Sequence, residues 1–330
     1  MEQIIENIYL IKVPLPGNPL KDLNVYFLKG SKRNLLIDTG FNLQRCYEAL
    51  KHGLDELNVD MNETDIFLTH LHADHSGLSG RIATANTKIY LSETDKKYLD
   101  LFFKPNYWRV RDKVFHAMGF SEDELTENQR RSPLTAYVPS ESNEYTLVKD
   151  GMKIDLGDYQ LTCFETPGHT PGHMCLIDEA RKILFSGDHI IFDITPNITT
   201  WEGVDNSLGL YLDSLNKIKT LDIKTTLSAH RSSLGSCHHR VDQLISHHLA
   251  RLAEVYQIVE ESPGMTAYKI ASRMTWSIRA KDWQSFPVVQ KWFAVGEATS
   301  HLEYFQCNGT IRRELEGSSY AYYINEKANN

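Results

Sequence analysis

The alternation of hydrophobic and polar residues over the first 90 positions predicts several short strands and one helix. Residues 43–58 place Leu43, Tyr47, Leu50 and Leu54 on one face of a helix. The strand candidates are short, rich in β-branched and aromatic residues, and mostly closed by Pro, Gly or a polar loop: they are residues 5–13, 23–30, 33–40, 64–70 and 88–93.

The pattern changes over about residues 93–140. Residues 93–119 form one long segment of helical period that is rich in aromatic side chains, and residues 121–132 predict a second helix with Ser121 as its N-cap. We interpret this stretch as a helical insertion between strands.

Strands return at residue 144, where the Lys149-Asp150-Gly151 turn predicts a hairpin. From about Ser236 the chain is mainly helical, and it ends in two short strands around a Gly-containing turn. Three helices followed by a hairpin is the order of a winged helix. We therefore predict a catalytic domain over 1–235 and a winged-helix-like domain over 236–330. Further elements expected in the first domain are strands within 144–169, 174–189 and 225–230, and a helix over 208–221.

Composition sets limits on function. The chain is 41% hydrophobic and 24% charged, and no apolar run approaches the roughly 20 residues of a membrane span. The N-terminus lacks the basic start of a signal peptide, so we expect a cytoplasmic protein. The five cysteines form no C-x-x-C pair, which disfavours a zinc ribbon or a disulfide framework. The net charge of −8 disfavours non-specific binding to polyanions.

The strongest chemical signal is the segment 69–77, Thr-His-Leu-His-Ala-Asp-His-Ser-Gly. It places four ligand-type side chains, His70, His72, Asp74 and His75, within six positions after an apolar strand. Imidazole and carboxylate suit zinc, iron and manganese. An extended loop lets His70 and His72 converge on one ion, and the other two can turn to a second ion about 3.5–4 Å away. The alternative, a solvated His-rich loop, would bring imidazoles together that repel when protonated.

Three later segments also carry possible metal ligands. Each places a ligand-type residue at the end of a predicted strand, where α/β proteins usually carry their site residues. They carry His169 within 166–173, Asp188 within 185–189, and His230 after 227–229. Each segment alone is weak evidence for a metal ligand, since a single His at a strand end is usually a hydrogen-bonded structural residue. We give His173 such a structural role.

Together, in this order, the motifs resemble those of the metallo-β-lactamase superfamily, over roughly residues 1–235. The resemblance implies an α/β fold, the αββα metallo-β-lactamase sandwich, and two divalent metal ions, with zinc the default and iron or manganese the alternatives. It implies that His70, His72 and His169 hold the first ion, that Asp74, His75 and His230 hold the second, and that Asp188 bridges the two. Asp38 matches the family's acid at a strand end and would orient a ligand His.

His72 bears on the reaction, because flavo-diiron oxygen reductases of this fold tend to carry Glu there. The resemblance therefore favours hydrolysis. A water between two cations would lose a proton near neutral pH, its pKa falling from about 15.7 toward 7. The hydroxide would attack, with Asp74 orienting it and passing its proton to the leaving group. We expect a hydrolase of small-molecule esters, thioesters or lactones. A phosphodiesterase or endoribonuclease on single-stranded RNA, and a non-catalytic binding member of the fold, are the alternatives.

The substrate contacts are harder to predict. The aromatic residues of the insertion either pack it onto the rest of the protein or line an apolar channel. Arg231, beside the last metal His, either binds an anionic group of the substrate or pairs with a nearby acid. The candidate substrate-binding residues are Tyr107, Trp108, His189, Phe192 and Arg231, and further wall candidates are Phe102, Phe103, Phe115, Phe120, Trp201, Trp276 and Trp283.

The C-terminal region resembles the small winged-helix domain of lactamase-beta-two-like hydrolases, some of which cleave single-stranded RNA. Residues 240–330 carry ten Lys/Arg and ten Asp/Glu without a basic stripe, so nucleic-acid binding is not favoured. We expect this domain to narrow the active site through residues such as Trp283 and Phe286, or to form a homodimer contact.

Overall fold

The protein is described by a computed structural model that covers residues 1–131, 137–233, 235–277 and 280–325. Its contacts divide the chain into two compact units. Unit 1 consists of Met1–Phe103, Ala136–Pro196 and Ser214–Val241, and unit 2 of Lys104–Thr135, Asn197–Asp213 and Asp242–Asn330. Within the described residues, the helices are too short or too polar to cross a bilayer.

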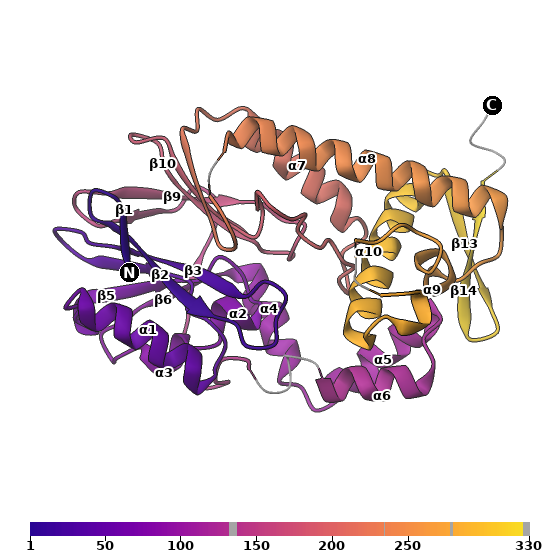
Figure 1. The fold of residues 1–330 in the computed structure, drawn as a ribbon, viewed down its shortest axis with the longest axis horizontal. Coiled ribbons are helices and arrows are strands. Elements are labelled where there is room, and N and C mark those ends of the chain that lie inside the picture. Colours follow the sequence, from indigo (N-terminus) through magenta and orange to yellow (C-terminus); the bar gives the residue numbers. More distant parts are fainter. Residues whose placement is uncertain (132–136, 234, 278–279, 326–330) are drawn as a thin grey trace. The chain divides into compact units, whose positions relative to one another are not determined.

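Unit 1 contains two β-sheets (Figure 1). The first has seven strands in sequence order. Strands β1 to β4 pair antiparallel, and β4 to β7 pair parallel. The strands are β1 (Glu2–Ile5), β2 (Ile8–Pro14), β3 (Asp22–Leu28), β4 (Asn34–Ile37), β5 (Thr64–Phe67), β6 (Ile89–Ser92) and β7 (Thr146–Val148).

The second sheet has the order β12-β11-β10-β9-β8, with only β11 and β12 parallel. The hairpin predicted at Lys149-Asp150-Gly151 is wrong, because β7 pairs with β6 of the first sheet while β8 pairs with β9 of the second. The turn therefore carries the chain from one sheet to the other. The strands are β8 (Lys153–Asp155), β9 (Gln160–Glu165), β10 (Met174–Asp178), β11 (Ile183–Gly187) and β12 (Thr225–Ser228).

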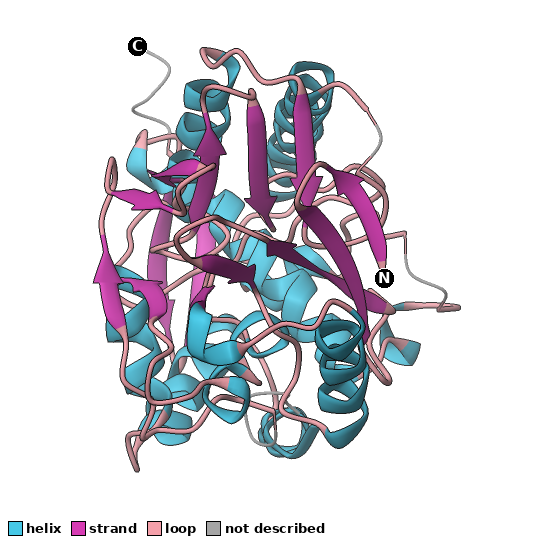
Figure 2. Ribbon diagram, turned by 90° about the vertical axis from the view of Figure 1, so that its left-hand side faces the viewer, coloured by secondary structure: helices cyan, strands magenta, loops and turns pink. Residues whose placement is uncertain are grey.

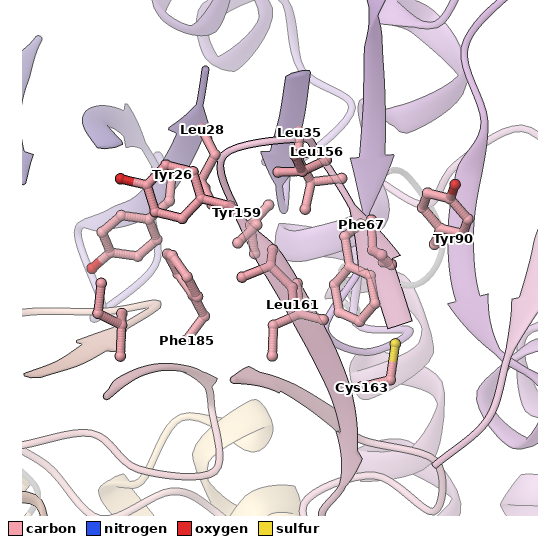
Figure 3. Packing of buried hydrophobic residues seen from close by; sticks show 14 of the residues in the cluster. Tyr26, Leu28, Leu35, Phe67, Tyr90, Leu156, Tyr159, Leu161, Cys163 and Phe185 are labelled. Atoms are coloured by element: carbon pink, nitrogen blue, oxygen red, sulfur yellow. The ribbon is translucent and has the colours of Figure 1, made fainter. Parts of the chain in front are cut away.

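The core of unit 1 contains residues of both sheets, so the sheets pack face to face (Figure 3). Tyr26 and Phe67 of the first sheet are buried together with Leu161, Cys163 and Phe185 of the second. The Tyr26 and Phe185 rings meet edge to face with centroids 5.7 Å apart. Each fully buried side chain of this size stabilises the fold by about 1.5–3 kcal/mol.

Short helices flank the first sheet, and α1 and α3 lie on its side away from the second sheet (Figure 1). Helix α1 approaches β2 closely, since a Cβ at Gly53 would lie 2.6 Å from Ile11 Cγ2. The long helix predicted over 93–119 is broken at Phe103–Asn106, where Pro105 cannot continue it. The helices are α1 (Gln44–Glu56), the 3-10 turn Met61–Glu63, α2 (Ala73–Ser76), α3 (Ser79–Ile82) and α4 (Glu93–Phe102).

Unit 2 is mainly helical, and Figure 2 shows the helices and strands of the described chain coloured by type. Its core combines Phe115 and Phe120 with Val295, Leu302 and Tyr322. Ser121 and Glu124 form a capping box that confirms the predicted start of α6. The elements are α5 (Tyr107–Met118), α6 (Glu122–Arg131), α9 (Ala267–Ala271), the 3-10 turn Trp283–Ser285, α10 (Val288–Cys307), β13 (Ile311–Glu316) and β14 (Ser319–Ile324).

Helices α7 (Ser207–Lys219) and α8 (Cys237–Glu261) contribute residues to both units. Of the predicted insertion, α5 and α6 cluster with the C-terminal elements in unit 2, and residues 132–136 lie outside the described residues. The winged-helix assignment of 236–330 stays a prediction.

Candidate metal centre

Seven His and Asp side chains of unit 1 gather where strands of both sheets end. The loop after β5 runs into α2 and carries the 70–75 cluster, while the β9–β10 loop and the segments after β11 and β12 carry the others. Three overlapping groups place their ligand atoms within 4.8 Å of one another: His70, His72 and His169; His70, His75 and Asp188; and Asp74, His75 and His230.

The first group consists of three imidazoles. His72 Nδ1 lies 2.9 Å from His70 Nε2 and 3.0 Å from His169 Nε2. Around a tetrahedral zinc with Zn–N bonds of about 2.0–2.1 Å, two donor atoms stand about 3.3 Å apart. The three nitrogens therefore have nearly the spacing of ligands around one ion.

The second group combines two imidazoles with a carboxylate. His230 Nε2 lies 3.3 Å from His75 Nε2 and 3.5 Å from Asp74 Oδ2, and the remaining distance, His75 Nε2 to Asp74 Oδ2, is 3.8 Å. These separations again match the edges of a small coordination polyhedron. Asp74 is the more accessible member, with a side chain 14% exposed while both imidazoles are fully buried.

Asp188 lies between the two groups. Its Oδ2 is 3.5 Å from His169 Nε2 in the first, and its Oδ1 is 3.4 Å from His230 Nε2 in the second. Oδ1 is buried and accepts no hydrogen bond from the part of the chain that the structure describes. A buried carboxylate oxygen of this kind is costly unless a positive charge faces it.

Hydrogen bonds at Nδ1 fix the orientation and the tautomer of two of these imidazoles. His75 Nδ1 donates to Asp38 Oδ2 at 2.8 Å, and His230 Nδ1 donates to the Asp22 carbonyl at 3.0 Å. Each neutral ring then turns the lone pair of its Nε2 toward the other, at 3.3 Å. Two lone pairs that face each other need a proton or a metal ion between them, so the donor set fits a metal ion.

His70 is oriented by a relay through Thr69. The Thr69 hydroxyl has one proton, which it donates to Asp38 at 2.9 Å, and it therefore accepts from His70 Nδ1 at 3.0 Å. The Nε2 lone pair of His70 is left facing His72 and the ligand cluster. Asp38 thus acts on both groups, and it does so from a left-handed backbone conformation with φ of 62° directly after β4.

Electrostatics differ between the two groups. Burial, with His169 nearby, lowers the pKa of His72 to about 3, so this ring stays neutral and able to coordinate. Burial also acts to lower the pKa of His75, but three carboxylates, Asp38, Asp188 and Asp74, outweigh it and raise the value to about 10. Carboxylates that favour a proton on His75 would favour a divalent cation in the same place.

Asp95 is a residue that sequence reasoning missed. It is fully buried near the start of α4, and its Oδ2 accepts hydrogen bonds from Leu71 N at 2.9 Å and Thr170 Oγ1 at 2.7 Å. Its Oδ1 accepts from Gly172 N at 2.7 Å. One carboxylate therefore ties the loop of His70 and His72 to the loop of His169. Its local signal, an Asp three residues after the N-cap Ser92, is that of an ordinary helix start.

His173 has a structural contact of the kind expected. Its Nε2 accepts from the backbone N–H of Asp188 at 3.1 Å, so the proton is on Nδ1, which donates to Thr166 Oγ1 at 2.8 Å. The ring therefore fixes the backbone of the residue that lies between the two groups.

Three predicted substrate residues lie near the cluster in sequence. Arg231 Nη2 donates to the Pro19 carbonyl at 2.5 Å, and His189 is fully buried with its ring 6.0 Å from that of His173. Phe192 is partly buried, and a Cβ at Gly235 would lie 2.8 Å from its ring. Their roles toward a substrate stay predictions.

The other two, Tyr107 and Trp108, belong to α5 in unit 2, with ring centroids 5.3 Å apart. Substrate binding by them also stays a prediction. Of the further aromatic wall candidates, Phe115 and Phe120 are buried in the core of unit 2, and Trp276 and Trp283 pack against that core. These four aromatic side chains therefore pack in or against the core of unit 2, which agrees with the alternative that the aromatic residues serve packing.

Comparisons with known proteins agree with this geometry. The chain is 25% identical to the probable metallo-hydrolase YqjP of Bacillus subtilis, over 95% of this chain and 97% of that protein. It is 31% identical to the human acyl-coenzyme A thioesterase MBLAC2, over 52% of this chain and 58% of that protein. The crystal structure of the metallo-beta-lactamase family protein TTHA1429 from Thermus thermophilus covers 98% of this chain and 100% of its own, with a TM-score of 0.83 and 24% identity.

The family pattern of the metallo-beta-lactamase superfamily matches residues 20–230, more than half of the chain. This range contains strands β3 to β12 and the seven clustered side chains. The chain therefore belongs to the metallo-β-lactamase superfamily of metal-dependent hydrolases.

Proposed function

We propose that the protein is a dinuclear hydrolase that cleaves an ester, thioester or lactone of a small molecule. The single observation that carries this proposal is Asp188, whose two oxygens face two separate groups of ligand atoms. A carboxylate in that position is suited to bridge two ions, and a pair of ions about 3.5–4 Å apart is the arrangement of many hydrolases.

His70, His72 and His169 would hold one ion, and Asp74, His75 and His230 the other, with Asp188 shared. Imidazole and carboxylate ligands without thiolates favour zinc by frequency and also accept iron or manganese. Asp38 would act from behind the ligands, since it holds His75 directly and His70 through Thr69.

Bound divalent cations would supply positive charge that stabilises a developing oxyanion and makes a nearby water more acidic. Asp74 is placed to handle the proton. Burial alone would raise the pKa of its carboxyl, but His75 and His230 hold it well below its usual range, so Asp74 is ionised and accepts hydrogen bonds. Its partly exposed side chain would orient the attacking water and then pass a proton to the leaving group.

An acyl substrate is favoured over RNA for two reasons. MBLAC2 is named as an acyl-coenzyme A thioesterase, which is a more specific activity than that of the probable metallo-hydrolase YqjP. Residues 240–330 also carry ten basic and ten acidic side chains, a balance unlike that of a phosphate-binding surface. Hydrolysis of a phosphodiester with the same ligand set is the second candidate.

A substrate panel tests the proposal. The zinc-loaded protein is assayed with a p-nitrophenyl ester, an acyl thioester followed by release of free thiol, a lactone, bis-p-nitrophenyl phosphate and single-stranded RNA. Turnover of one acyl substrate, abolished by His72→Ala and retained by His52→Ala, is expected. His52 is the matched control, because it is a histidine of the same unit with a side chain 75% exposed.

Cleavage of RNA or the phosphodiester alone would replace the proposal by its second candidate. Activity that survives His72→Ala would point to a contaminating enzyme. A protein that binds two ions but turns over nothing on the panel would favour a binding role.

A further inference from the structure

Unit 2 contains an arginine, Arg111, that forms no ion pair with any residue that the structure describes and lies at the centre of a group of aromatic rings. The guanidinium carbon of Arg111, on α5, lies 4.8 Å from the ring centroid of Trp108, 5.4 Å from that of Phe115 and 4.6 Å from that of Trp292 on α10. All three distances are within the roughly 6 Å of a cation–π contact. Phe115 and Trp292 stack on each other with centroids 5.4 Å apart.

Two hydrogen-bond donors in this group lack acceptors. Arg111 Nη1 and Trp292 Nε1 are both buried, and neither finds a partner among residues 1–131, 137–233, 235–277 and 280–325. Arg111 also forms no ion pair with a described carboxylate within 4.0 Å. Buried donors without acceptors are rare in native proteins, and each one needs an explanation.

Arg251 of the same unit combines an aromatic ring with carboxylates. Its guanidinium carbon lies 4.3 Å from the ring centroid of Trp276, much like Arg111 over its rings. Arg251, however, pairs with Glu254 and lies 3.5 Å from a Glu297 oxygen. Arg251 therefore has carboxylates beside its ring, although its Nη2 is also buried without a partner among the described residues, whereas Arg111 has no described carboxylate within 4.0 Å.

The surroundings of Arg111 indicate what would supply the missing charge. Burial lowers the pKa of the Arg111 guanidinium, which Tyr107 and Asp112 only partly oppose, so its charge is poorly compensated. Arg111 is only partly buried as a residue although its Nη1 is covered, and the neighbouring apolar residues Val114 and Phe293 are 43% and 37% exposed. A ligand arriving from solvent would meet a planar cation beside apolar surface.

We propose that Arg111, Trp108 and Trp292 form a binding site for an oxyanion, a carboxylate or a phosphate, carried on an apolar body. The planar fork of the guanidinium matches both oxyanions with two parallel hydrogen bonds. The aromatic rings would contact the apolar part of the ligand, and Trp292 Nε1 offers a further donor. The site lies entirely within unit 2, and its existence does not depend on the hydrolytic activity.

Titration of the full-length protein with sodium benzoate, followed by NMR of the five tryptophan indole N–H groups, tests the site. Trp108→Phe and Trp292→Phe assign the two signals of interest. Benzoate is expected to shift these two signals saturably while Trp201, Trp276 and Trp283 stay unmoved. Benzamide, which has the same ring without the charge, is expected to shift neither. Inorganic phosphate is expected to bind at the same signals more weakly than benzoate, because it lacks the apolar body.

Arg111→Met keeps the apolar stem and removes the charge, and it should weaken benzoate binding at least tenfold. Arg313→Met is the matched control, since Arg313 is an exposed arginine of unit 2 that lies 4.1 Å over the Tyr320 ring, and it should bind benzoate as the wild type does. If Arg111→Met does not fold, Arg111→Lys, which keeps the charge without the fork, should bind several-fold more weakly.

Equal binding of benzoate by the Arg111 variant and the wild type, or equal shifts with benzamide, would overturn the assignment of an oxyanion site. Binding of phosphate but not benzoate would overturn the proposal that the ligand carries its oxyanion on an apolar body. Each of these results is independent of whether the metal centre hydrolyses an ester.

Discussion

Replacing Asp95 by Asn should weaken metal binding without touching a ligand. Asp95 accepts hydrogen bonds from Leu71 N, Thr170 Oγ1 and Gly172 N, which lie in the two loops that carry His70, His72 and His169. An asparagine that keeps its oxygen toward Leu71 and Thr170 must turn its amide N–H₂ toward the Gly172 N–H. The variant thus loses one hydrogen bond to a charged acceptor and leaves two buried donors, the Gly172 N–H and the amide N–H₂, facing each other.

The magnitude follows from that change. Hydrogen bonds to charged groups contribute about 1.5–3 kcal/mol, and if the loss falls mainly on the ordered, metal-binding arrangement of the loops, the ion binds about 10- to 100-fold more weakly. Burial raises the pKa of Asp95 to about 6 although its three hydrogen bonds oppose this, so measurements at pH 7.5 compare an ionised Asp with a neutral Asn.

The assay is a zinc titration against a chromogenic chelator, together with the visible spectrum of the Co²⁺-substituted protein, which reports ligand geometry. Asp178→Asn is the matched control, because Asp178 is equally buried but accepts from Arg181 N at 2.9 Å in the turn between β10 and β11. It should lower the melting temperature and leave zinc affinity within about threefold. If Asp95→Asn merely lowers the melting temperature and binds zinc like the wild type, Asp95 does not position the ligands.

Three further perturbations have defined outcomes. Asp38→Asn should lower zinc affinity about 10- to 100-fold, because it alters the partners of His75 and Thr69; unchanged affinity by chelator competition would argue against the relay. Glu303 has its pKa raised to about 8 by burial, with Asp205 adding and Arg313 opposing, so the folded state holds a proton that the unfolded state releases above about pH 4.5. The contribution of Glu303 to stability should therefore fall between about pH 4.5 and 8, by up to about 1.4 kcal/mol per pH unit, and in urea melts over this range the wild type should lose more stability than Glu303→Gln. Gly53→Ala would place a Cβ 2.6 Å from Ile11 Cγ2 and should cost about 1–3 kcal/mol, and the cost should shrink in an Ile11→Ala background; an undiminished cost in that double-mutant cycle would show that the clash is elsewhere.

The candidate metal ligands could be predicted from the sequence because the patterns that indicate them are local. The cluster at 70–75 is dense, and His169, Asp188 and His230 each directly follow a segment of strand-like pattern. Strands whose ends converge in the fold then bring these residues together without any further information.

Asp95 could not be predicted in the same way, since its role consists of contacts with residues 71, 170 and 172 in two distant loops. The hairpin expected at Lys149–Gly151 failed for a related reason. A Gly-containing turn fixes a local change of direction but not the partner of the strand that follows, and β8 found its partner in β9. The break between α4 and α5, by contrast, had a signal in Pro105.

We propose that seven side chains of unit 1 hold two divalent ions, with Asp188 shared between them. Elemental analysis of the purified protein, after chelator treatment and dialysis against zinc, tests it most directly. The wild type should contain about two ions per chain, and Asp188→Asn and His72→Ala should each contain fewer, while His52→Ala should match the wild type. A wild-type content near zero, or the same content in His72→Ala as in the wild type, would contradict the claim.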